Sequence, residues 1–117
     1  MPTVSVILPT HNRANLLSRS IGSVLSQTFT DLECLVIDDA SADETEQFVR
    51  CQMEKDSRLR YYRHETRKNA AGARNTGVKI ARGRFVAYHD DDDEWLPAKL
   101  EKQMNCFSDS TVGVVFC

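Results

Sequence analysis

The sequence lacks several features that would fix a function class at once: it has no large charge excess, no long apolar run and no close pair of cysteines. A formal net charge of −2 over 117 residues gives no whole-chain reason to expect nucleic acid or an anionic membrane as a partner. No apolar run approaches the roughly 18 residues that cross a bilayer, and the start, MPTVSVILPT, lacks the basic residues of a secretion signal. The spacing of Cys34, Cys51, Cys106 and Cys117 is not typical of a metal site, so free thiols in a reducing cytoplasm are expected.

What the sequence does contain is the composition of a globular domain, with 41% hydrophobic and 27% charged residues. A chain of this length forms at most one domain, which buries roughly two-thirds of its surface. Its last residues, TVGVVFC, are apolar and β-branched, with no terminal polar residues. Residues 1–117 are therefore expected to be the N-terminal portion of a longer domain.

Two patterns alternate along the chain and predict an α/β fold. Short apolar, β-branched runs predict strands at 3–8, 32–37, 58–63 and 84–89, with a fifth beginning in 111–117. Helical spacing predicts helices up to about Gln27, after a capping box of Ser41 and Glu44, over 70–82, and from Pro97 to about Cys106. The helix over 70–82 is rich in small residues and is expected to pack closely. Short connections favour a three-layer α/β/α sandwich around a mainly parallel sheet, with 58–63 near an edge.

Three unusual segments follow predicted strands: PTHNR (9–13), DDASADET (38–45) and HDDDDEW (89–95). In a parallel sheet the carboxyl ends of the strands lie at one edge, and ligands bind in the crevice beyond them. We therefore expect the three segments to meet at one rim.

The acidic run raises an energetic question, because adjacent carboxylates repel one another. Two unit charges about 4 Å apart cost about 4 kcal/mol at an effective dielectric constant of about 20. A divalent cation would offset this, and a set of oxygen ligands favours Mg²⁺, Mn²⁺ or Ca²⁺. Asp90 and Asp92 are predicted metal ligands because alternate residues of an extended segment point the same way. A solvated acidic loop is the alternative; an EF-hand is disfavoured because Trp95 stands where glycine is required.

The other two segments offer groups that suit a nucleotide. Asp38 or Asp39 would accept a hydrogen bond from a base N–H or a ribose hydroxyl, with turn formation and helix capping as the alternative. A planar base would rest on the ring of His11 while Arg13 meets phosphate. Arg74 is a second candidate for a diphosphate, and a surface arginine is the plain reading of the same residue.

The remaining polar and aromatic residues give weaker signals. His89 is expected to be structural rather than a metal ligand, and His64 to be a loop residue. The basic stretch 55–68 is best explained as a solvated edge, with an anionic acceptor or a membrane surface as the alternative. Trp95 fits the core as well as it fits contact with a sugar.

The segments VSVILPTHNR, QTFTDLECLVIDDASADET and NAAGARNTGVKIARGRFVAYHDDDDEWLPAKLEKQ resemble, in order and spacing, the family 2 glycosyltransferases. These are inverting enzymes of the Rossmann-like GT-A fold, and the resemblance covers essentially the whole chain. It implies the nucleotide-sugar-binding part of an enzyme of polysaccharide or cell-envelope glycan synthesis. Such an enzyme transfers a sugar from a nucleotide-diphosphate sugar, expected to be a UDP-sugar, to an acceptor hydroxyl with inversion.

The resemblance also implies roles for residues. Asp39 matches the aspartate that reads the base, and Thr10 and His11 fall where the family contacts uracil, although tyrosine is usual at position 11. Asp92 matches the direct ligand of Mn²⁺ or Mg²⁺, and Asp91 is expected toward the ribose or the donor sugar. The implied nucleotide- and donor-binding set is Pro9, Thr10, His11, Arg13, Asp38, Asp39, Arg74, Asp90 and Asp91; the implied metal ligands are Asp92 and Asp90.

The family's catalytic base lies downstream of the acidic motif and is expected beyond Cys117, so this chain is expected to bind the donor without transferring the sugar. A cytoplasmic location is expected, with peripheral contact to the inner face of the membrane through the missing part. The alternative function is a non-enzymatic α/β module that binds a nucleotide or a divalent metal. A phospho-acceptor receiver or a DxD phosphatase would carry its acidic pair after the first strand, where this chain has 9–13.

Overall fold

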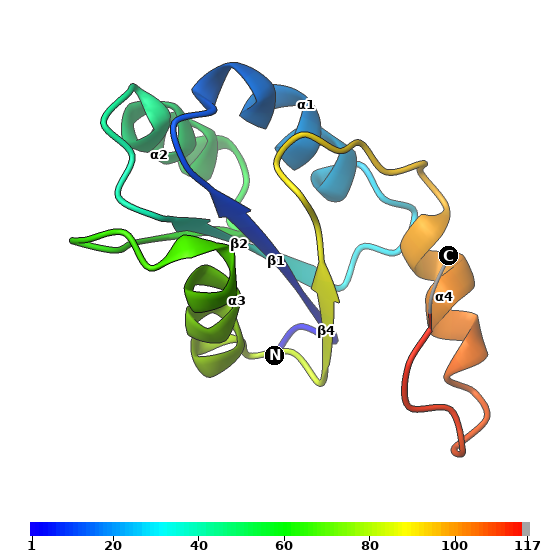
Figure 1. Ribbon diagram of the computed structural model, residues 1–117. Helices are drawn as coiled ribbons and strands as arrows, with labels where there is room; N and C mark the ends of the chain where they lie inside the picture. Colours follow the sequence, from blue (N-terminus) through cyan, green and yellow to red (C-terminus); the bar gives the residue numbers. More distant parts are fainter. Residues whose placement is uncertain (116–117) are drawn as a thin grey trace.

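Four strands and four helices alternate along the chain in the computed structural model, which describes residues 1–115 (Figure 1). The strands are β1 (Val4–Thr10), β2 (Leu32–Asp38), β3 (Leu59–Arg63) and β4 (Phe85–Tyr88). The helices are α1 (Ala14–Leu25), α2 (Thr45–Lys55), α3 (Asn69–Ile80) and α4 (Lys99–Cys106). The predicted alternation is confirmed.

The sheet has the order β3-β2-β1-β4, and all of its pairings are parallel. β3 lies at an edge, as the sequence predicted. The register places Thr10 opposite Asp38, and Asp38 opposite Arg63, so the ends of β1, β2 and β3 are level. The segments that leave these strands therefore start from one edge of the sheet.

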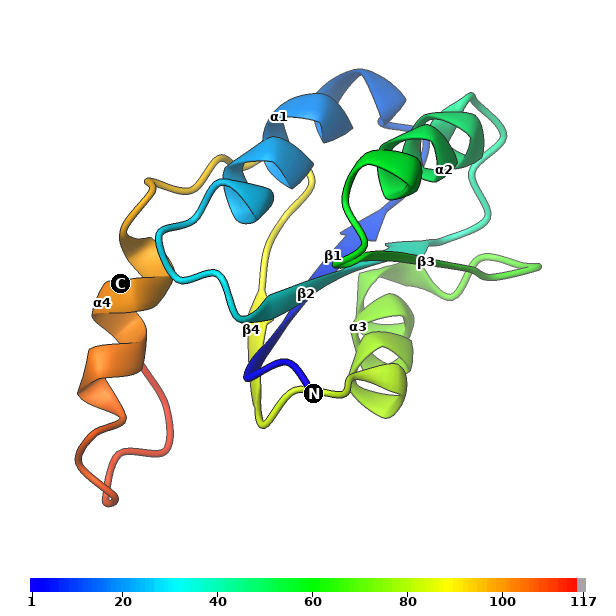
Figure 2. The ribbon, with the colours of Figure 1, turned by 180° about the vertical axis from the view of Figure 1, so that it is seen from behind.

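Helices cover both faces of the sheet, which confirms the three-layer sandwich. α1 and α2 lie on one face and α3 on the other, while α4 lies beyond the β4 edge (Figures 1 and 2). Alternate residues of β1 serve the two layers: Val6 and Leu8 belong to the core that includes α1, and Ile7 packs with Ala73 of α3. No helix in residues 1–115 is long and apolar enough to cross a membrane.

The small residues of α3 allow this helix to lie close to the sheet. A Cβ atom added to Gly77 would lie 2.5 Å from Cγ2 of Ile7, a distance that real Cβ contacts do not show. Ala73, one turn earlier, is fully buried. The close packing expected for this helix is confirmed.

The predicted capping box is wrong. α2 begins at Thr45, and the N-cap residue, Glu44, makes no side-chain capping bond. The hydroxyl of Ser41 is used elsewhere, because it accepts a hydrogen bond from the backbone N–H of Asn12 at 2.9 Å. Asp43 takes the capping role instead: its carboxylate accepts bonds from the N–H of Thr45 at 3.1 Å and from the Thr45 hydroxyl at 2.5 Å.

Two predictions near the C-terminal end also need correction. α4 begins at Lys99, two residues after Pro97, whose carbonyl accepts a bond from the N–H of Thr28. The fifth strand is absent from residues 111–115, and 116–117 lie outside the described residues. The Asp109 carboxylate accepts bonds from the N–H and hydroxyl of Thr111, which closes a turn where the strand was expected.

Candidate functional site

A cavity of about 480 Å³ opens at the carboxyl ends of β1 and β2, beside the first turns of α3. All of the predicted ligand-binding residues except Asp38 line it. The lining residues are Pro9, Thr10, His11, Arg13, Asp39, Arg67, Ala70, Ala73, Arg74, Asp90, Asp91 and Asp92. The expectation that three distant segments meet at one rim is therefore confirmed.

Three turns around this rim contain a non-glycine residue in the left-handed region: Asn12, Ala40 and Asn69, with φ of 51°, 60° and 66°. For alanine this conformation costs about 1–2 kcal/mol, so the surrounding contacts must hold it. The side chain of Asn12 helps to do so, because its Oδ1 accepts a bond from the N–H of Ala42 at 2.7 Å. This hydrogen bond thus links the turn after β1 to the turn after β2.

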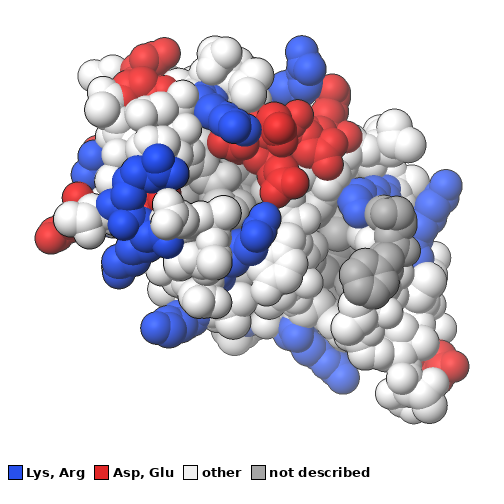
Figure 3. Space-filling model, viewed as in Figure 1, with Lys and Arg blue, Asp and Glu red and all other residues white. Residues whose placement is uncertain are grey.

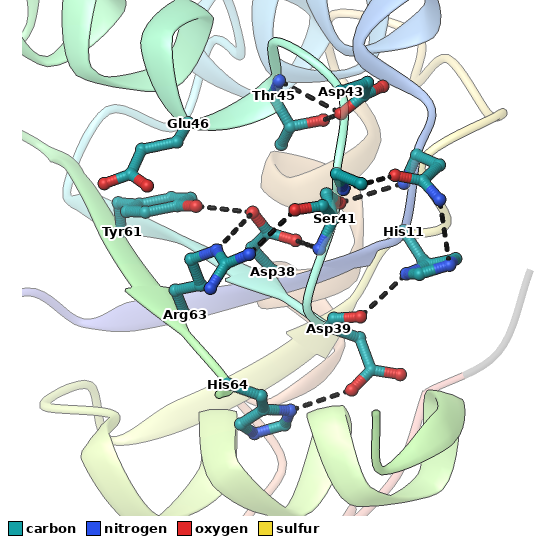
Figure 4. Close-up of polar contacts among 12 residues, drawn as sticks. His11, Asp38, Asp39, Ser41, Asp43, Thr45, Glu46, Tyr61, Arg63 and His64 are labelled. Atoms are coloured by element: carbon teal, nitrogen blue, oxygen red, sulfur yellow. Dashed lines mark hydrogen bonds and ion pairs between the residues drawn. The ribbon is translucent and has the colours of Figure 1, made fainter. Parts of the chain in front are cut away.

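His11 is fixed at the cavity wall by both of its ring nitrogens (Figure 4). Its Nδ1 lies 2.7 Å from the carbonyl oxygen of Asp39, which can only accept, so Nδ1 carries the proton. Its Nε2 lies 3.1 Å from Nδ2 of Asn12, which donates. These bonds set the tautomer and the place of the ring, as a surface for a planar base requires.

Asp39 is buried and its carboxylate is held by three donors, of which Figure 4 shows His64. Nδ1 of His64 lies 2.9 Å from Oδ1, and the backbone N–H groups of Lys68 and Asn69 each donate at 2.8 Å. Burial acts to raise the pKa of Asp39, but the hydrogen bonds from His64, Lys68 and Asn69 outweigh it and lower the pKa. The cavity therefore presents an ionised carboxylate, which accepts hydrogen bonds only.

Asp38 points to a different part of the molecule. It is fully buried, and its carboxylate accepts bonds from the N–H of Ser41 at 2.9 Å and from the hydroxyl of Tyr61. Arg63 lies 3.9 Å away and donates to the carbonyl of Ser41 (Figure 4). These contacts match the turn-forming role that the sequence left open for this residue.

The acidic run does not continue the strand, so the expectation of an extended segment is wrong. β4 ends at Tyr88, and the N–H of Asp93 donates to the carbonyl of Asp90 at 3.1 Å to close a turn. Asp90 and Asp92 nevertheless both line the cavity, with side chains 64% and 60% exposed. Their assignment as metal ligands stays a prediction.

Asp91, between them, is instead buried against the β1 segment. The hydroxyl of Thr10 donates to its Oδ2 at 2.9 Å, and Nη1 of Arg13 donates to its Oδ1 at 3.0 Å. These bonds connect the acidic turn to the end of β1. Asp91 thus fixes the position of its two exposed neighbours.

Arginine side chains compensate the acidic run in the described part of the chain, and Figure 3 shows the red cluster beside blue side chains. Arg13 lies 3.0 Å from Asp91 and 3.6 Å from Asp92, and Arg74 lies 3.4 Å from Asp90. The pairs of Arg13 with Asp92 and of Arg74 with Asp90 are exposed, and such pairs are worth about 0.2–1 kcal/mol each, so a stronger ligand can displace them.

A divalent cation fits the chemistry of this turn if a ligand completes its coordination. Within residues 1–115, no three His, Cys, Asp or Glu side chains gather as a metal-binding group of their own. Asp90 and Asp92 offer exposed oxygen atoms to one cavity. Mg²⁺ is commonly held by one or two carboxylates together with water and substrate phosphates, and this donor set matches that pattern.

Sequence reasoning missed Arg67, Ala70 and Ala73 as lining residues. Arg67 belongs to the basic stretch explained as a solvated edge, and its side chain is 55% exposed, yet its Nε lies 3.5 Å from Oδ2 of Asp39. His64 is a loop residue as predicted, but the sequence did not indicate that it is only 3% exposed. Their position in the chain could have indicated a role at the site, because Arg67 and His64 both lie between the end of β3 and the start of α3.

His89 and Trp95 are core residues, in agreement with the structural roles considered for them. Their rings pack edge to face with centroids 4.4 Å apart, and both side chains are buried. Neither ring nitrogen of His89 makes a well-formed hydrogen bond in the described residues, although the Ser20 backbone interacts with the ring. Burial is the main cause that lowers the pKa of His89, against the opposing effects of Asp93, Asp90 and the Ser20 backbone.

The comparisons with known sequences all identify the same family. The sequence model of glycosyl transferase family 2 matches residues 5–117. The chain is 42% identical over 113 residues to the Escherichia coli UDP-Glc:alpha-D-GlcNAc-diphosphoundecaprenol beta-1,3-glucosyltransferase WfgD, covering 97% of this chain and 44% of that protein. It is 35% identical to the putative teichuronic acid biosynthesis glycosyltransferase TuaG of Bacillus subtilis, covering 98% of this chain and 46% of TuaG. The chain thus spans less than half the length of these relatives.

Solved structures agree with the sequence relatives. The mannosyltransferase PcManGT of Pyrobaculum calidifontis, in complex with GDP-Man and Mn²⁺, matches with a TM-score of 0.87 and 34% identity over 96% of this chain and 34% of that chain. S. aureus TarS in complex with UDP matches with a TM-score of 0.82 and 31% identity over 92% of this chain and 32% of that chain. These likenesses confirm the GT-A fold that the sequence predicted.

Proposed function

Because this chain belongs to glycosyl transferase family 2, we propose that its cavity binds the nucleoside diphosphate of a sugar donor, a UDP-sugar. The protein of which these residues form a part would transfer that sugar to an acceptor hydroxyl, with inversion. The convergence of the 9–13, 38–45 and 89–95 segments on one cavity carries this proposal. The names of WfgD, which specifies UDP-Glc, and of TarS in complex with UDP support the choice of donor.

The base would lie against His11 and donate an N–H to Asp39, since the His11 ring is fixed and the Asp39 carboxylate is ionised. The diphosphate would lie between Arg13 and Arg74, whose guanidinium groups line the same cavity from the two sides of the acidic turn. An arginine suits this position because its planar fork pairs with two phosphate oxygens at once.

Asp90 and Asp92 would hold a Mn²⁺ or Mg²⁺ ion, which when bound draws charge from the leaving nucleoside diphosphate. Asp91 and Thr10 would keep the two ligands in place through the bond between them. The general base that deprotonates the acceptor is expected outside residues 1–117. This chain would therefore bind the donor and leave transfer to the whole protein.

The acceptor is proposed to be a lipid-linked or other cell-envelope glycan at the cytoplasmic face of the membrane. The name of WfgD includes a diphosphoundecaprenol acceptor, and that of TuaG includes teichuronic acid biosynthesis. Both proteins extend well beyond the part that this chain matches, so acceptor recognition belongs to the proposal for the whole protein.

The proposal is tested by titrating the chain with UDP, GDP and dTDP, each with and without Mn²⁺. UDP affinity should rise with Mn²⁺, and Asp92→Ala should lose this metal-dependent gain, by about tenfold or about 1.4 kcal/mol. Asp93→Ala is the matched control, because it removes the same charge from the same run and Asp93 is not among the lining residues. Equal losses in the two variants would argue against the assigned ligands.

A second assay separates the alternative function. A non-enzymatic nucleotide- or metal-binding module would also bind in the titration, but the whole protein would then release no UDP from a UDP-sugar in the presence of acceptor glycans. If the chain binds none of the three nucleotides, the proposal that the cavity is a nucleotide site is contradicted.

A further inference from the structure

His64 lies in the loop after β3 and is bonded through three of its atoms. Its backbone N–H donates to the carbonyl of Asp38 at 2.8 Å. Its ring Nδ1 lies 2.9 Å from Oδ1 of Asp39, and its Nε2 lies 2.8 Å from the hydroxyl oxygen of Thr76 on α3. Figure 4 shows the ring between the Asp39 carboxylate and the helix below it. The residue therefore joins the end of β2 to α3.

The donors around Asp39 leave a defined part of its carboxylate free. Each carboxylate oxygen has two lone pairs. On Oδ1, both are used by His64 and by the N–H of Lys68. On Oδ2, one is used by the N–H of Asn69, while Arg67 stays at 3.5 Å. Oδ2 thus keeps acceptor capacity, and Asp39 lines the cavity.

We propose that His64 is a positioning residue for base selection: by occupying Oδ1 and anchoring to Thr76, it aims Oδ2 of Asp39 at a ring N–H of the bound base. This inference rests on the proposed function of the cavity. An ionised carboxylate accepts from N3–H of uracil, whereas cytosine presents a lone pair at N3. A fixed, buried acceptor rejects a partner that lacks the donor, because both groups then stay unpaired.

The contacts of His64 allow a matched pair of variants. The amide nitrogen of asparagine takes the place of Nδ1, so His64→Asn keeps the bond to Asp39 and loses Thr76. The longer glutamine places its amide near Nε2, so His64→Gln keeps Thr76 and loses the bond to Asp39. Both substitutions remove the imidazole ring. If His64 only stabilises the fold, the two variants should therefore change by the same amount.

The test is the ratio of UDP to CDP affinity, measured by calorimetry with Mn²⁺ on the wild-type chain, both His64 variants and Asp39→Asn. We expect the wild-type chain to prefer UDP by about tenfold or more. His64→Asn, which keeps the bond to Asp39 but loses Thr76, should keep part of this preference, and His64→Gln and Asp39→Asn should lose most of it. Affinity for inorganic pyrophosphate should stay unchanged in both His64 variants, because pyrophosphate does not contact the base subsite.

The outcomes separate this inference from the function on which it rests. A UDP preference that Asp39→Asn abolishes and His64→Gln retains would overturn the inference and leave the proposed function intact. A wild-type chain that binds neither nucleotide would overturn both. If His64→Gln melts at a temperature too low for titration, Thr76→Val loosens the same ring from α3; a partial loss of UDP preference supports the inference, and an unchanged ratio overturns it.

Discussion

Among single residues, Arg13 has two roles that compete with each other. Its guanidinium pairs with Asp91 and Asp92, and it also lines the proposed diphosphate site. Arg13→Gln removes a positive charge that opposes a cation at the acidic turn. An exposed ion pair is worth about 0.2–1 kcal/mol, so Mn²⁺ alone should bind up to about fivefold more tightly to the variant. Inorganic pyrophosphate with Mn²⁺ should bind more weakly, because the arginine fork is lost.

The two affinities are measured by electron paramagnetic resonance for Mn²⁺ and by calorimetry for pyrophosphate. Arg19→Gln is the control, since Arg19 pairs with Glu94 at 3.8 Å and does not line the cavity. If both affinities move in the same direction in Arg13→Gln, the competition described here does not exist.

The two most buried histidines should respond oppositely to the same substitution. Neither ring nitrogen of His89 makes a well-formed hydrogen bond in the described residues, whereas both of His64 are bonded. His89→Leu should raise the free energy of unfolding by about 1–3 kcal/mol, because it removes a buried polar ring whose nitrogens make no well-formed hydrogen bond in the described residues. His64→Leu should lower it by a similar amount, because it removes one donor from the buried Asp39 carboxylate and the ring partner of the Thr76 hydroxyl. Urea unfolding of the three proteins measures this; a loss of stability in His89→Leu would contradict the reading of that site.

At the scale of elements, the contact between α3 and β1 depends on a missing side chain. Gly77→Ala places a Cβ atom 2.5 Å from Cγ2 of Ile7, and overpacking of this kind costs about 1–3 kcal/mol. Gly22 of α1 is the matched control, because a Cβ atom there meets nothing within 4 Å. Gly22→Ala should stabilise the fold by about 0.5–1 kcal/mol through helix propensity. Thermal melts that shift both variants in the same direction would rule out this packing argument.

Prediction from sequence worked well for elements and less well for the contacts of single residues. The alternation of patterns fixed which segments leave the sheet at one edge, and therefore brought His11, Asp39 and Asp92 together. Asp38 and Asp39 could not be told apart in this way, since both are buried and adjacent residues at a strand end point in opposite directions. Only the contacts show that Asp38 bonds to Tyr61 while Asp39 lines the cavity. His64 was missed because its partners lie 25 and 12 residues away, on β2's exit turn and on α3.

At the scale of the whole molecule, Glu33 links the sheet at the end opposite the cavity. Its buried carboxylate on β2 accepts bonds from Ser5 of β1 at 2.7 Å, from Arg60 of β3 at 2.9 Å and from the N–H of Arg82 before β4 at 2.8 Å. Burial acts to raise the pKa of Glu33, but the bonds from Arg82, Ser5 and Arg60 outweigh it, and the pKa lies below its ordinary value of 4.5.

A lowered pKa in the folded state means that Glu33 contributes stability above pH 4.5, which is lost as the pH falls through the folded-state pKa. Glu33→Gln should therefore be less stable than the wild-type chain near neutral pH, and the difference should shrink in acid. Urea unfolding of both proteins at several values between about pH 7 and about pH 3 measures it. A difference that stays constant over this range would show that the charge of Glu33 contributes nothing.

The central claim is that the acidic turn holds a cation that carries a diphosphate between Arg13 and Arg74. A crystal structure of the chain with UDP and Mn²⁺ tests it most directly. The account predicts the metal at about 2.0–2.3 Å from oxygen atoms of Asp92 and Asp90, with the diphosphate bound to the same ion and the base beside His11. Electron density that places UDP elsewhere, with Asp90 and Asp92 extended into solvent, would contradict it.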